Sequence, residues 1–432
     1  MNQPLLRFLI TNNYKSLSLD KIVELQNLNI FIGANNSGKS NFINCLKFLK
    51  DSLTKTPEQN RGVSSFEDAI AQIGGHRILD ITVKSPAQVR LAYCFNFPQN
   101  LPKNQDSTIL DLTFLVNHRN VSIAKESLYT GLKLDNFNSI PDFYYYKFHH
   151  KESGKGEIAI SNQENSNEKN LTQKFQGIND IPINSLALSL IPELLESSLV
   201  NTPVYKIRRD LIEFIYNWQF YNANNMDVHK IRIAEPKLGG RDIYLSASGE
   251  NLALVLENLI QEDIDFEDSI NRALKAILPK TRRFRPLRSG RLSLNLEWYF
   301  ENIKEPLYLD KLSDGTVRML CWATILHSPI LPSLLVIDEP ELGLHISWMP
   351  ILAEWIKSAA RKTQVIITTH SPDLLDHFTD CLENVFCFYS EDKMHFSMKT
   401  LSREMLSPKL AEGWELGDLY RVGDPSIGGW PW

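Results

Sequence analysis

Residues 28–40 contain the feature that most restricts the fold: a short apolar run, a glycine-rich octapeptide and the start of a helical pattern. The run LNIFI is typical of a buried strand, and NFINCLKFLK repeats apolar residues at helical spacing. The octapeptide fits G-x-x-x-x-G-K-S/T, in which small residues let backbone N–H groups surround phosphate oxygens at a helix N-terminus. Its members are Gly33, Ala34, Asn35, Asn36, Ser37, Gly38, Lys39 and Ser40.

This strand–loop–helix context argues against a chance match, which would arise in about one in a hundred chains of this length. In such loops the lysine reaches the β- and γ-phosphates of a nucleotide, and the final Ser or Thr binds Mg²⁺. The pattern therefore predicts these roles for Lys39 and Ser40.

A second apolar run, LLVID, ends in two acids, Asp338 and Glu339. Ligands bind at the carboxyl ends of parallel strands, so both side chains are expected at a ligand-binding edge. We predict that Asp338 holds Mg²⁺, directly or through water, and that Glu339 orients and deprotonates the attacking water. The alternative is a solvated acidic turn, against which the apolar run leading into Asp-Glu argues.

Two further segments lie close to the acidic run along the chain. LSDGT contains Ser313, Asp314 and Gly315 and precedes a helical pattern, so it could present a helix N-terminus to an anion. Read alone, it is more typical of a simple helix cap. Its position relative to the other motifs reverses that preference and favours the anion site. His370 ends the strand pattern QVIITTH and is expected at the same sheet edge, within reach of a γ-phosphate.

The order GANNSGKS, LSDGT, LLVIDEPELGLH, TTHSP resembles the ABC-type ATPases of the RecF and SMC group. It is most similar to the compact AAA_21-type AAA family ATPases, which include overcoming-lysogenization-defect-like and phage-defence proteins. NYKSL, SASGENLALVLENL and the tail GGWPW also resemble that family. The resemblance covers both ends of the chain well and the middle weakly.

The resemblance implies ATP and Mg²⁺ as cofactors and ATP hydrolysis as the activity. It makes LSDGT the signature motif, ELGLH the D-loop and His370 the switch histidine. Two heads of such proteins sandwich two ATP molecules, so a homodimer is implied in which Ser313 and Gly315 act in trans. A glutamine near the metal is also implied; Gln72 is our candidate, and Gln88 competes with it. The D-loop lacks the proline that the family often has after His345.

The strand and helix patterns predict an α/β fold: an ABC-type ATPase head with a parallel core sheet, an N-terminal β-lobe and an inserted helical region. No heptad pattern is sustained, so long coiled-coil arms are not expected. The expected parts are an N-terminal core with the phosphate loop (1–75), a β-rich lobe (76–150), a flexible polar loop (151–175), a mainly helical insertion (176–300) and a C-terminal core (301–432).

The composition of the chain excludes several kinds of binding partner. The net charge of −5 excludes a protein that coats nucleic acid or an anionic membrane through its overall charge. The five cysteines lack the spacing that zinc sites favour, and no run is long enough to cross a bilayer. We therefore expect reduced thiols, no membrane contact and a cytoplasmic location.

A basic segment, KTRRFRPLRSGR, could contact nucleic acid phosphates through Arg282, Arg283 and Arg285. The acidic stretch EDIDFED precedes it, so a self-paired face is at least equally compatible with the sequence. The segment after His370 is expected to be too short for the nuclease domain of overcoming-lysogenization-defect proteins. We therefore expect an ATPase that drives or gates a DNA-repair or anti-phage assembly, or alternatively a slow scaffold that restrains a separately encoded effector.

Overall fold

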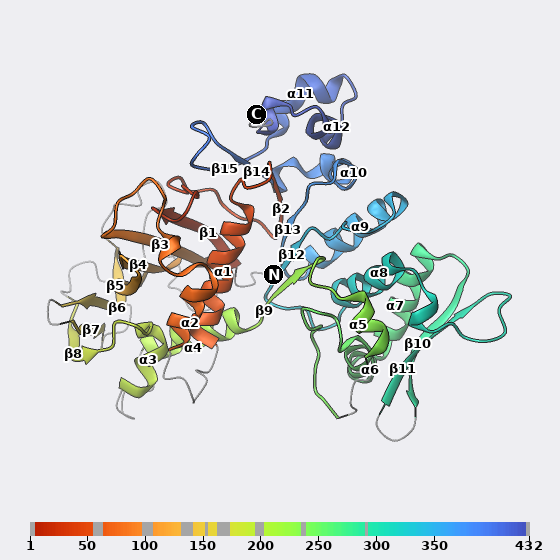
Figure 1. Ribbon diagram of the computed structural model, residues 1–432, viewed down its shortest axis with the longest axis horizontal. Coiled ribbons are helices and arrows are strands. Elements are labelled where there is room, and N and C mark those ends of the chain that lie inside the picture. Colours follow the sequence, from red (N-terminus) through yellow and green to blue (C-terminus); the bar gives the residue numbers. More distant parts are fainter. Residues whose placement is uncertain are drawn as a thin grey trace.

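The computed structural model describes most of the chain, and the account below is limited to the described residues. These are residues 5–54, 64–96, 107–130, 141–151, 154–161, 173–194, 203–234, 239–289 and 293–428. They form two large sheets, one hairpin and twelve α-helices, so the predicted α/β class is confirmed (Figure 1).

A six-stranded sheet forms the centre of the molecule, and five of its strands run parallel. Alternate side chains of its strands enter two different hydrophobic cores: Ile30 and Ile32 lie in one core and Phe31 in the other. Burial on both faces explains why LLVI is continuously apolar and why LNIFI is apolar except for Asn29, whose buried amide donates to backbone carbonyl oxygens. In spatial order the strands are β15 (Ser397–Thr400), β14 (Val385–Tyr389), β2 (Leu28–Ile32), β13 (Gln364–Thr368), β12 (Leu334–Asp338) and β9 (Trp218–Asn222).

A seven-stranded antiparallel sheet forms the β-lobe at the left of Figure 1. The sequence placed this lobe at residues 76–150, and the sheet also recruits strands from both sides of that range. Its strands in spatial order are β1 (Leu5–Asn12), β3 (Ala87–Asn96), β4 (Thr108–Asn117), β5 (Asn120–Thr130), β6 (Phe143–His150), β7 (Gly156–Ser161) and β8 (Phe175–Ile181).

The expectation of an exposed loop over 151–175 was wrong in part. Strand β7 lies inside that range, and its alternating Ile158 and Ile160 are buried in the lobe core. The polar residues on either side concealed this short period-2 pattern. Residues 152–153 and 162–172 lie outside the described part of the chain.

The helices cover both faces of the core sheet. Those on one side, α1, α2 and α4, share a core with the β-lobe, and those on the other side, α5 to α9, surround a second core with the hairpin. The helices are α1 (Lys39–Thr54), α2 (Ser65–Gln72), α3 (Ala187–Leu194), α4 (Pro203–Tyr216), α5 (Val228–Ile233), α6 (Leu252–Glu262), α7 (Ile264–Ile277), α8 (Asp314–Leu326), α9 (Met349–Ala360), α10 (Pro372–Leu375), α11 (Arg403–Ala411) and α12 (Leu416–Arg421).

Short 3-10 turns connect several of these elements. They are η1 (Gly75–Ile78), η3 (Leu309–Lys311), η4 (Ile346–Trp348), η5 (Asp376–Asn384) and η6 (Pro425–Ile427). None of the described helices is both long and apolar enough to cross a bilayer. All five cysteines are free thiols, and four of them are buried.

The insertion predicted as mainly helical, 176–300, also contains strands. The antiparallel hairpin of β10 (Thr281–Ser289) and β11 (Ser293–Phe300) packs on α6 and α7. Strand β9 in the same range is an edge strand of the core sheet and pairs in parallel with β12. The sequence missed β9 because its five residues follow directly on helix α4, which hides the change of period.

Candidate functional site

The glycine-rich loop joins β2 to α1 in a conformation that needs glycine at two positions. Gly33 has φ 144° and Gly38 has φ 95°, both in the region that side chains disfavour. A Cβ atom on Gly33 would lie 2.8 Å from the Phe388 carbonyl oxygen and 2.8 Å from Ser37 Oγ. Backbone therefore lines this turn where a side chain cannot fit.

Lys39 begins α1, and its ammonium group folds back into the loop. Nζ donates to the carbonyl oxygens of Gly33 (2.7 Å) and Ala34 (2.9 Å) and to Ser37 Oγ (3.2 Å). Burial lowers the pKa of Lys39 to about 8, and the two carboxylates at the end of β12 partly oppose that shift. A buried cation held only by neutral oxygens would gain from an anionic partner at this position.

Asp338 lies at the carboxyl end of β12 between two neighbouring strands. Its Oδ1 accepts a hydrogen bond from Thr368 Oγ1 at the end of β13. Its Oδ2 accepts from Nδ2 of Asn222, the last residue of β9, at 2.6 Å. Asn222 is also the register partner of Asp338, so the parallel pairing itself brings the amide to the acid.

Asn222 was not among the predicted site residues, because the sequence of β9 was not recognised as a strand. Its signal was the run WQFYN, in which aromatic residues are followed by an amide at the end of a strand. Gln72 lies at the exposed end of α2, and Gln88 lies on an exposed position of β3. The assignment of Gln72 to the metal stays a prediction.

Glu339 follows Asp338 with a left-handed backbone, φ 53°, which is uncommon for a residue other than glycine. Its N–H donates to the Thr368 carbonyl oxygen at 3.1 Å. The Glu339 carboxylate accepts a long hydrogen bond from Asn224 Nδ2 at 3.4 Å, and its Oε1 lies 3.8 Å from His370 Nε2. The turn therefore aims the carboxylate at the end of β13, where His370 lies.

His370 is held by its backbone and by its ring. Its N–H donates to Glu341 Oε1 at 3.1 Å, and Thr369 Oγ1 donates to the same oxygen at 2.6 Å. Its Nδ1 lies 3.1 Å from the hydroxyl of Tyr420, which in turn donates to the Gly33 carbonyl oxygen at 3.2 Å. Burial and the nearby Lys39 lower the pKa of His370 to about 4, so the ring is neutral at pH 7.

Glu341 and Tyr420 are two further residues that the motif search missed. Burial raises the pKa of Glu341, and its Oε2 has no hydrogen-bond partner among the described residues. Glu341 is part of the DEPE run, and nothing in that run sets it apart from its neighbours. Tyr420 lies fifty positions after His370 in a short helix without a motif. Only the folded chain brings them to the site.

The carboxyl edge of the core sheet thus brings together the loop after β2, the two acids after β12 and the histidine after β13. The neighbouring strands are β2, β13 and β12 in that order, so their ends are adjacent. One lysine, two carboxylates and a neutral histidine face one backbone cradle. Such an arrangement can bind a polyphosphate and hold a base beside it.

No group of three or more His, Cys, Asp or Glu side chains in the described ranges is arranged to hold a metal ion. Mg²⁺ in phosphoryl-transfer sites is usually held by one or two carboxylates together with substrate phosphates and water. Asp338 supplies one carboxylate at this edge, and the exposed Ser40 supplies a hydroxyl at the first turn of α1. These donors fit a phosphate-bound Mg²⁺.

Ser313, Asp314 and Gly315 lie at the start of α8, on the other side of the molecule from α1 (Figure 1). Ser313 is the helix N-cap, and its side chain accepts from the N–H of Thr316. Asp314 forms an ion pair with Arg232 at 2.8 Å. Within a single chain these residues therefore have the geometry of a helix cap, exposed at its tip.

Gly315 packs closely against the ELGLH segment. A Cβ atom on Gly315 would lie 3.1 Å from the Gly343 carbonyl oxygen and 3.2 Å from the Trp348 ring. Arg318 NH1, one turn further along α8, donates to the Leu342 carbonyl oxygen. The start of α8 and the segment after Glu339 therefore form one continuous surface.

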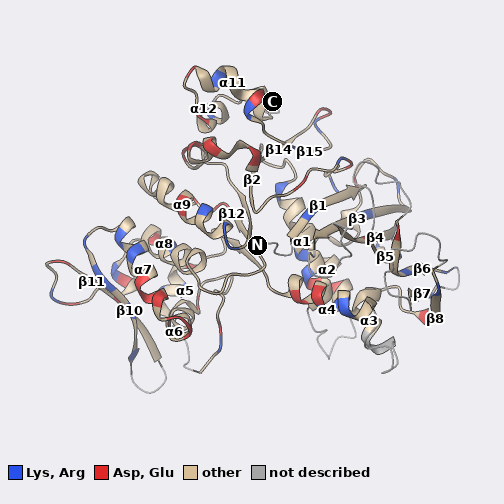
Figure 2. Cartoon of the chain, turned by 180° about the vertical axis from the view of Figure 1, so that it is seen from behind, with Lys and Arg blue, Asp and Glu red and all other residues tan. Residues whose placement is uncertain are grey.

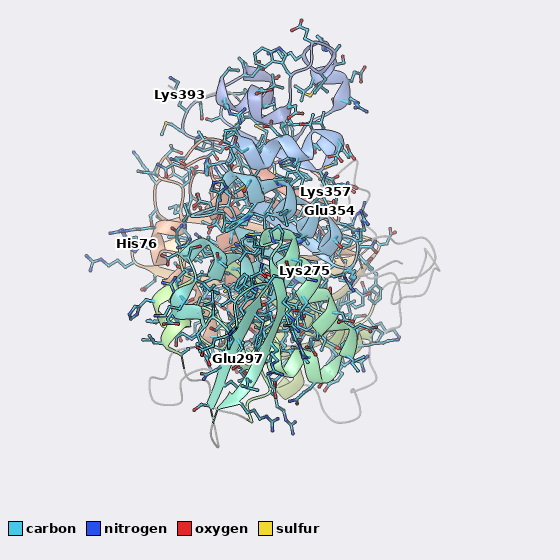
Figure 3. The ribbon with its side chains drawn as sticks, turned by 90° about the vertical axis from the view of Figure 1, so that its right-hand side faces the viewer. His76, Lys275, Glu297, Glu354, Lys357 and Lys393 are labelled. Carbon is cyan, nitrogen blue, oxygen red and sulfur yellow. The ribbon has the colours of Figure 1, made fainter. Side chains whose placement is uncertain are left out.

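Three arginines of β10, namely Arg283, Arg285 and Arg288, are paired with acids of the same chain, and Arg282 is exposed. Arg283 contacts Glu267 of α7 at 2.6 Å, and Arg285 contacts Glu297 of β11 at 3.5 Å. Figure 3 labels Glu297 on this hairpin. Figure 2 shows acidic positions of α6 and α7 beside basic positions of the hairpin. The self-paired alternative therefore describes most of this cluster.

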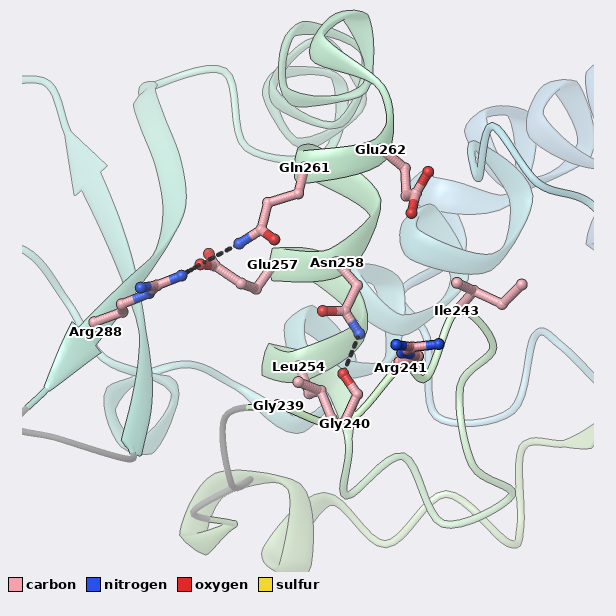
Figure 4. Close-up of a pocket in the computed structure, with 10 residues that line it drawn as sticks. All are labelled: Gly239, Gly240, Arg241, Ile243, Leu254, Glu257, Asn258, Gln261, Glu262 and Arg288. Carbon is pink, nitrogen blue, oxygen red and sulfur yellow. Dashed lines mark hydrogen bonds and ion pairs between the residues drawn. The ribbon is translucent and has the colours of Figure 1, made fainter.

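Arg288 extends the same pattern into a neighbouring cavity. It contacts Glu257 of α6 at 3.3 Å at the edge of a cavity of about 650 Å³ that Arg241 and Asn258 also line (Figure 4). Arg291 lies outside the described residues.

The sequence that forms this site matches the model of a known protein family. A family model described as "AAA domain, putative AbiEii toxin, Type IV TA system" (AAA_21) matches residues 28–85 and 118–376. The chain belongs to this family. The two matched stretches of this AAA_21 protein contain the glycine-rich loop, both acids of β12 and His370. The predicted family is therefore confirmed.

A solved structure of an SMC head shares the fold of the AAA_21 protein. The SMC head bound to the C-winged helix domain of ScpA is 12% identical with a TM-score of 0.53, covering 92% of this chain and 98% of its own. The SMC head domain from Thermotoga maritima is 11% identical with a TM-score of 0.45, covering 92% and 99%.

The SMC head of Pyrococcus furiosus, with an extended coiled coil and the C-terminal domain of ScpA, is 12% identical with a TM-score of 0.47, covering 95% and 99%. No curated protein sequence matches the chain. The AAA_21 protein is thus an ATPase of the AAA type with the fold of an SMC head, as predicted.

Proposed function

We propose that the protein binds ATP with Mg²⁺ at the edge of the core sheet and hydrolyses it to ADP and phosphate. The observation that carries this proposal is the convergence of Lys39, Asp338, Glu339 and His370 on one glycine-rich cradle. Lys39 would exchange its loop carbonyls for the β- and γ-phosphates, which are stronger acceptors for a cation.

Asp338 and Ser40 would hold Mg²⁺, with Asn222 fixing the carboxylate of Asp338. The bound ion neutralises charge on the phosphates and aligns them. Two hydrogen bonds to Asp338, one from each neighbouring strand, keep its carboxylate from rotating. The acid is therefore held ready at the position where the ion must bind.

Glu339 would orient the attacking water and accept its proton. Among the described residues, its carboxylate accepts a single long hydrogen bond, from Asn224, and it faces His370 across 3.8 Å. It therefore keeps oxygen lone pairs for a water molecule. A base held in this way contributes about 10²- to 10⁴-fold to the rate of proton transfer steps.

The test compares Lys39→Ala and Glu339→Gln with wild type in an ATPase assay and in an ATP-binding titration. We expect Lys39→Ala to lose binding, and Glu339→Gln to bind ATP normally but hydrolyse it about a hundredfold more slowly. Glu354→Gln, an exposed change on α9, is the matched control and should behave like wild type. Wild-type turnover in both site variants would show that the assignment is wrong.

ATP would also close a head-to-head homodimer in which Ser313 and Gly315 of one protomer contact the nucleotide of the other. The exposed tip of α8 and its contact with the ELGLH segment support this proposal. Mixing inactive Lys39→Ala with inactive Ser313→Arg should restore about a quarter of wild-type activity, since each heterodimer keeps one intact composite site. No recovery on mixing would count against sites shared between protomers.

The cycle would drive or gate an assembly for DNA repair or defence against phage. The family description names a toxin–antitoxin system, which is compatible with the defence role and does not bear on DNA repair. The second candidate is a slow scaffold that restrains a separately encoded effector, which the exposed α8 and ELGLH surface could engage. Purification from the host with and without ATP distinguishes the two. A stoichiometric protein partner released by nucleotide favours the scaffold, and its absence favours the driven assembly.

A further inference from the structure

Helix α12 near the C-terminus is bound tightly to the helix that follows His370. The N–H of Gly417 donates to Asp376 Oδ1 at 2.7 Å, and a Cβ atom on Gly417 would lie 2.1 Å from the Pro372 carbonyl oxygen. Arg421 contacts Asp373 of α10 at 2.5 Å. The two helices lie together at the top of Figure 1, so α12 is fixed relative to His370.

Tyr420 of α12 reaches from this contact into the nucleotide edge. Its side chain is buried, and its hydroxyl lies 3.2 Å from the Gly33 carbonyl oxygen and 3.1 Å from His370 Nδ1. The same carbonyl oxygen accepts from Lys39 Nζ at 2.7 Å. One phenol therefore connects the glycine-rich loop with the histidine after β13.

The proton count of this contact favours one tautomer of the histidine. A tyrosine hydroxyl has one proton, and the Gly33 carbonyl oxygen can only accept, so the hydroxyl donates there. It can then contact His370 only by accepting a hydrogen bond from Nδ1–H. Because the ring is neutral at pH 7, Nε2 carries no proton and presents a lone pair.

Nε2 is the ring nitrogen that faces the proposed base. It lies 3.8 Å from Glu339 Oε1, beyond direct hydrogen-bond distance, and neither atom has a proton to donate. A group with two hydrogens, such as the attacking water, satisfies both acceptors. An Nε2–H form would instead point a donor at the carboxylate and remove the acceptor that Nε2 offers to that water.

We propose that Tyr420 is a positioning residue that holds His370 in its Nδ1–H form, so that Nε2 and Glu339 together accept from the attacking water. The inference rests on the proposed ATP hydrolysis. Tyr420 also donates to the Gly33 carbonyl oxygen. It therefore fixes the position of His370 relative to the glycine-rich loop that binds the phosphates. Tyr420 itself touches neither the water nor the nucleotide.

The first test determines the tautomer of His370 directly and needs no ATPase activity. Protein with ¹⁵N-labelled histidine is compared with the His370→Ala variant to identify the His370 signals by NMR. We expect Nδ1 protonated and Nε2 unprotonated in wild type, and a gain of the Nε2–H form in Tyr420→Phe. An Nε2–H form in wild type, or the same tautomer in both proteins, would overturn the inference.

The second test is a double-mutant cycle on ATP turnover. Tyr420→Phe keeps the ring in place, and we expect kcat to fall about tenfold with KM for ATP within about twofold of wild type. In the His370→Ala background the same change should have no further effect, since Tyr420 acts through the histidine. Effects that multiply would indicate a merely structural role and would overturn the inference.

Tyr93→Phe is the matched control for the loss of a buried hydroxyl. Its phenol donates to the Cys45 carbonyl of α1 at 2.8 Å, away from His370. It should leave kcat and the His370 spectrum unchanged. The two tests also separate the inference from the proposed function: an inactive wild type with Nδ1–H overturns only hydrolysis, whereas an active wild type with Nε2–H overturns only the role of Tyr420.

Discussion

The nucleotide edge and the β10–β11 hairpin are the two regions whose sequences point to phosphate binding, and their structures differ. At the edge, Lys39 is buried on neutral carbonyl oxygens of a glycine turn. On the hairpin, Arg283 and Arg288 are exposed and lie against glutamates of α7 and α6. Among the described residues, Lys39 has no anionic partner in direct contact, whereas Arg283 and Arg288 each have one.

The difference shows that positive charge by itself does not define a phosphate site. At the edge, backbone geometry prevents side chains from filling the cradle, so the lysine can be satisfied further only by a ligand. On the hairpin, a guanidinium that already pairs with an acid gains less free energy from an external phosphate, because the existing ion pair must be given up. Predictions that alter the two regions separately test this contrast.

The largest effect is expected from Gly33→Ala. The added Cβ would lie 2.8 Å from the Phe388 carbonyl oxygen in a backbone conformation that side chains disfavour. The glycine-rich loop must move to relieve this clash, and its backbone N–H groups then no longer surround the phosphates. We therefore expect ATP affinity to fall at least about a hundredfold. Binding is measured by titration with a fluorescent ATP analogue.

Gly413→Ala is the matched control for this change. Gly413 also has a positive φ, 90°, but a Cβ there meets no atom within 4 Å. It therefore reproduces the backbone strain without the clash in the cradle, and ATP affinity should be unchanged. Equal losses in both variants would mean that strain, and not the cradle, explains the result for Gly33.

Asn222→Ala tests the acid side of the same edge. Removing the amide takes away one of two hydrogen bonds that orient Asp338, so the concentration of Mg²⁺ needed for turnover should rise about tenfold. The control is Asn217→Ala, which removes an amide contact to the Glu213 carbonyl just before the same strand. An unchanged Mg²⁺ requirement in Asn222→Ala would contradict the role given to this amide.

The motifs of the edge could be found in the sequence because each was read together with its strand. The apolar runs before Gly33 and Asp338 are buried on both faces of the core sheet, and this burial leaves a strong pattern. The chemistry-bearing residues at the ends of those runs then had to share one edge. The α/β class and the family followed from this order of motifs.

The residues that were missed depend on contacts between distant segments. Asn222 reaches Asp338 only because a five-residue strand joins the sheet beyond β12, and Tyr420 reaches His370 only because α12 docks on α10. Neither segment has a periodic pattern long enough to be recognised. The hairpin was missed for a related reason, since its arginines mask the alternation of Phe284 and the residues around it.

The third prediction concerns pH and the charge of Lys39. In the free protein Lys39 loses its proton above about pH 8, whereas bound phosphates would keep it protonated. ATP binding then takes up a proton above pH 8, so the Kd for ATP should rise with pH, by up to about tenfold per unit.

The carboxylates beside Lys39 give this prediction an internal control. Glu339 raises the pKa of Lys39, so Glu339→Gln should move the onset of weaker binding to a lower pH. Both proteins are titrated with ATP from about pH 7 to 9.5, a range that spans the lysine pKa. A Kd that stays constant across this range in wild type would contradict the lowered pKa.

The smallest effects are expected on the hairpin. Arg283→Ala removes an exposed ion pair with Glu267 and should lower the free energy of unfolding by about 0.2–1 kcal/mol, with ATP turnover unchanged. Thermal or urea unfolding measures the change. A loss well above this range would show that the pair stabilises the hairpin more than its exposure suggests.

The hairpin also decides how far the contrast between the two regions extends. We measure duplex DNA binding of Glu339→Gln with ATP and Mg²⁺ across a salt series, before and after neutralising Arg282, Arg283 and Arg285 together. Since Arg283 and Arg285 already pair with acids, we expect affinity to change by less than about twofold. Glu267→Gln is the reverse control, because it releases Arg283 and should strengthen any phosphate contact there. Salt-sensitive binding that the arginine changes abolish would mean that the hairpin exchanges its glutamates for DNA, and the contrast would then fail in favour of a DNA-acting machine.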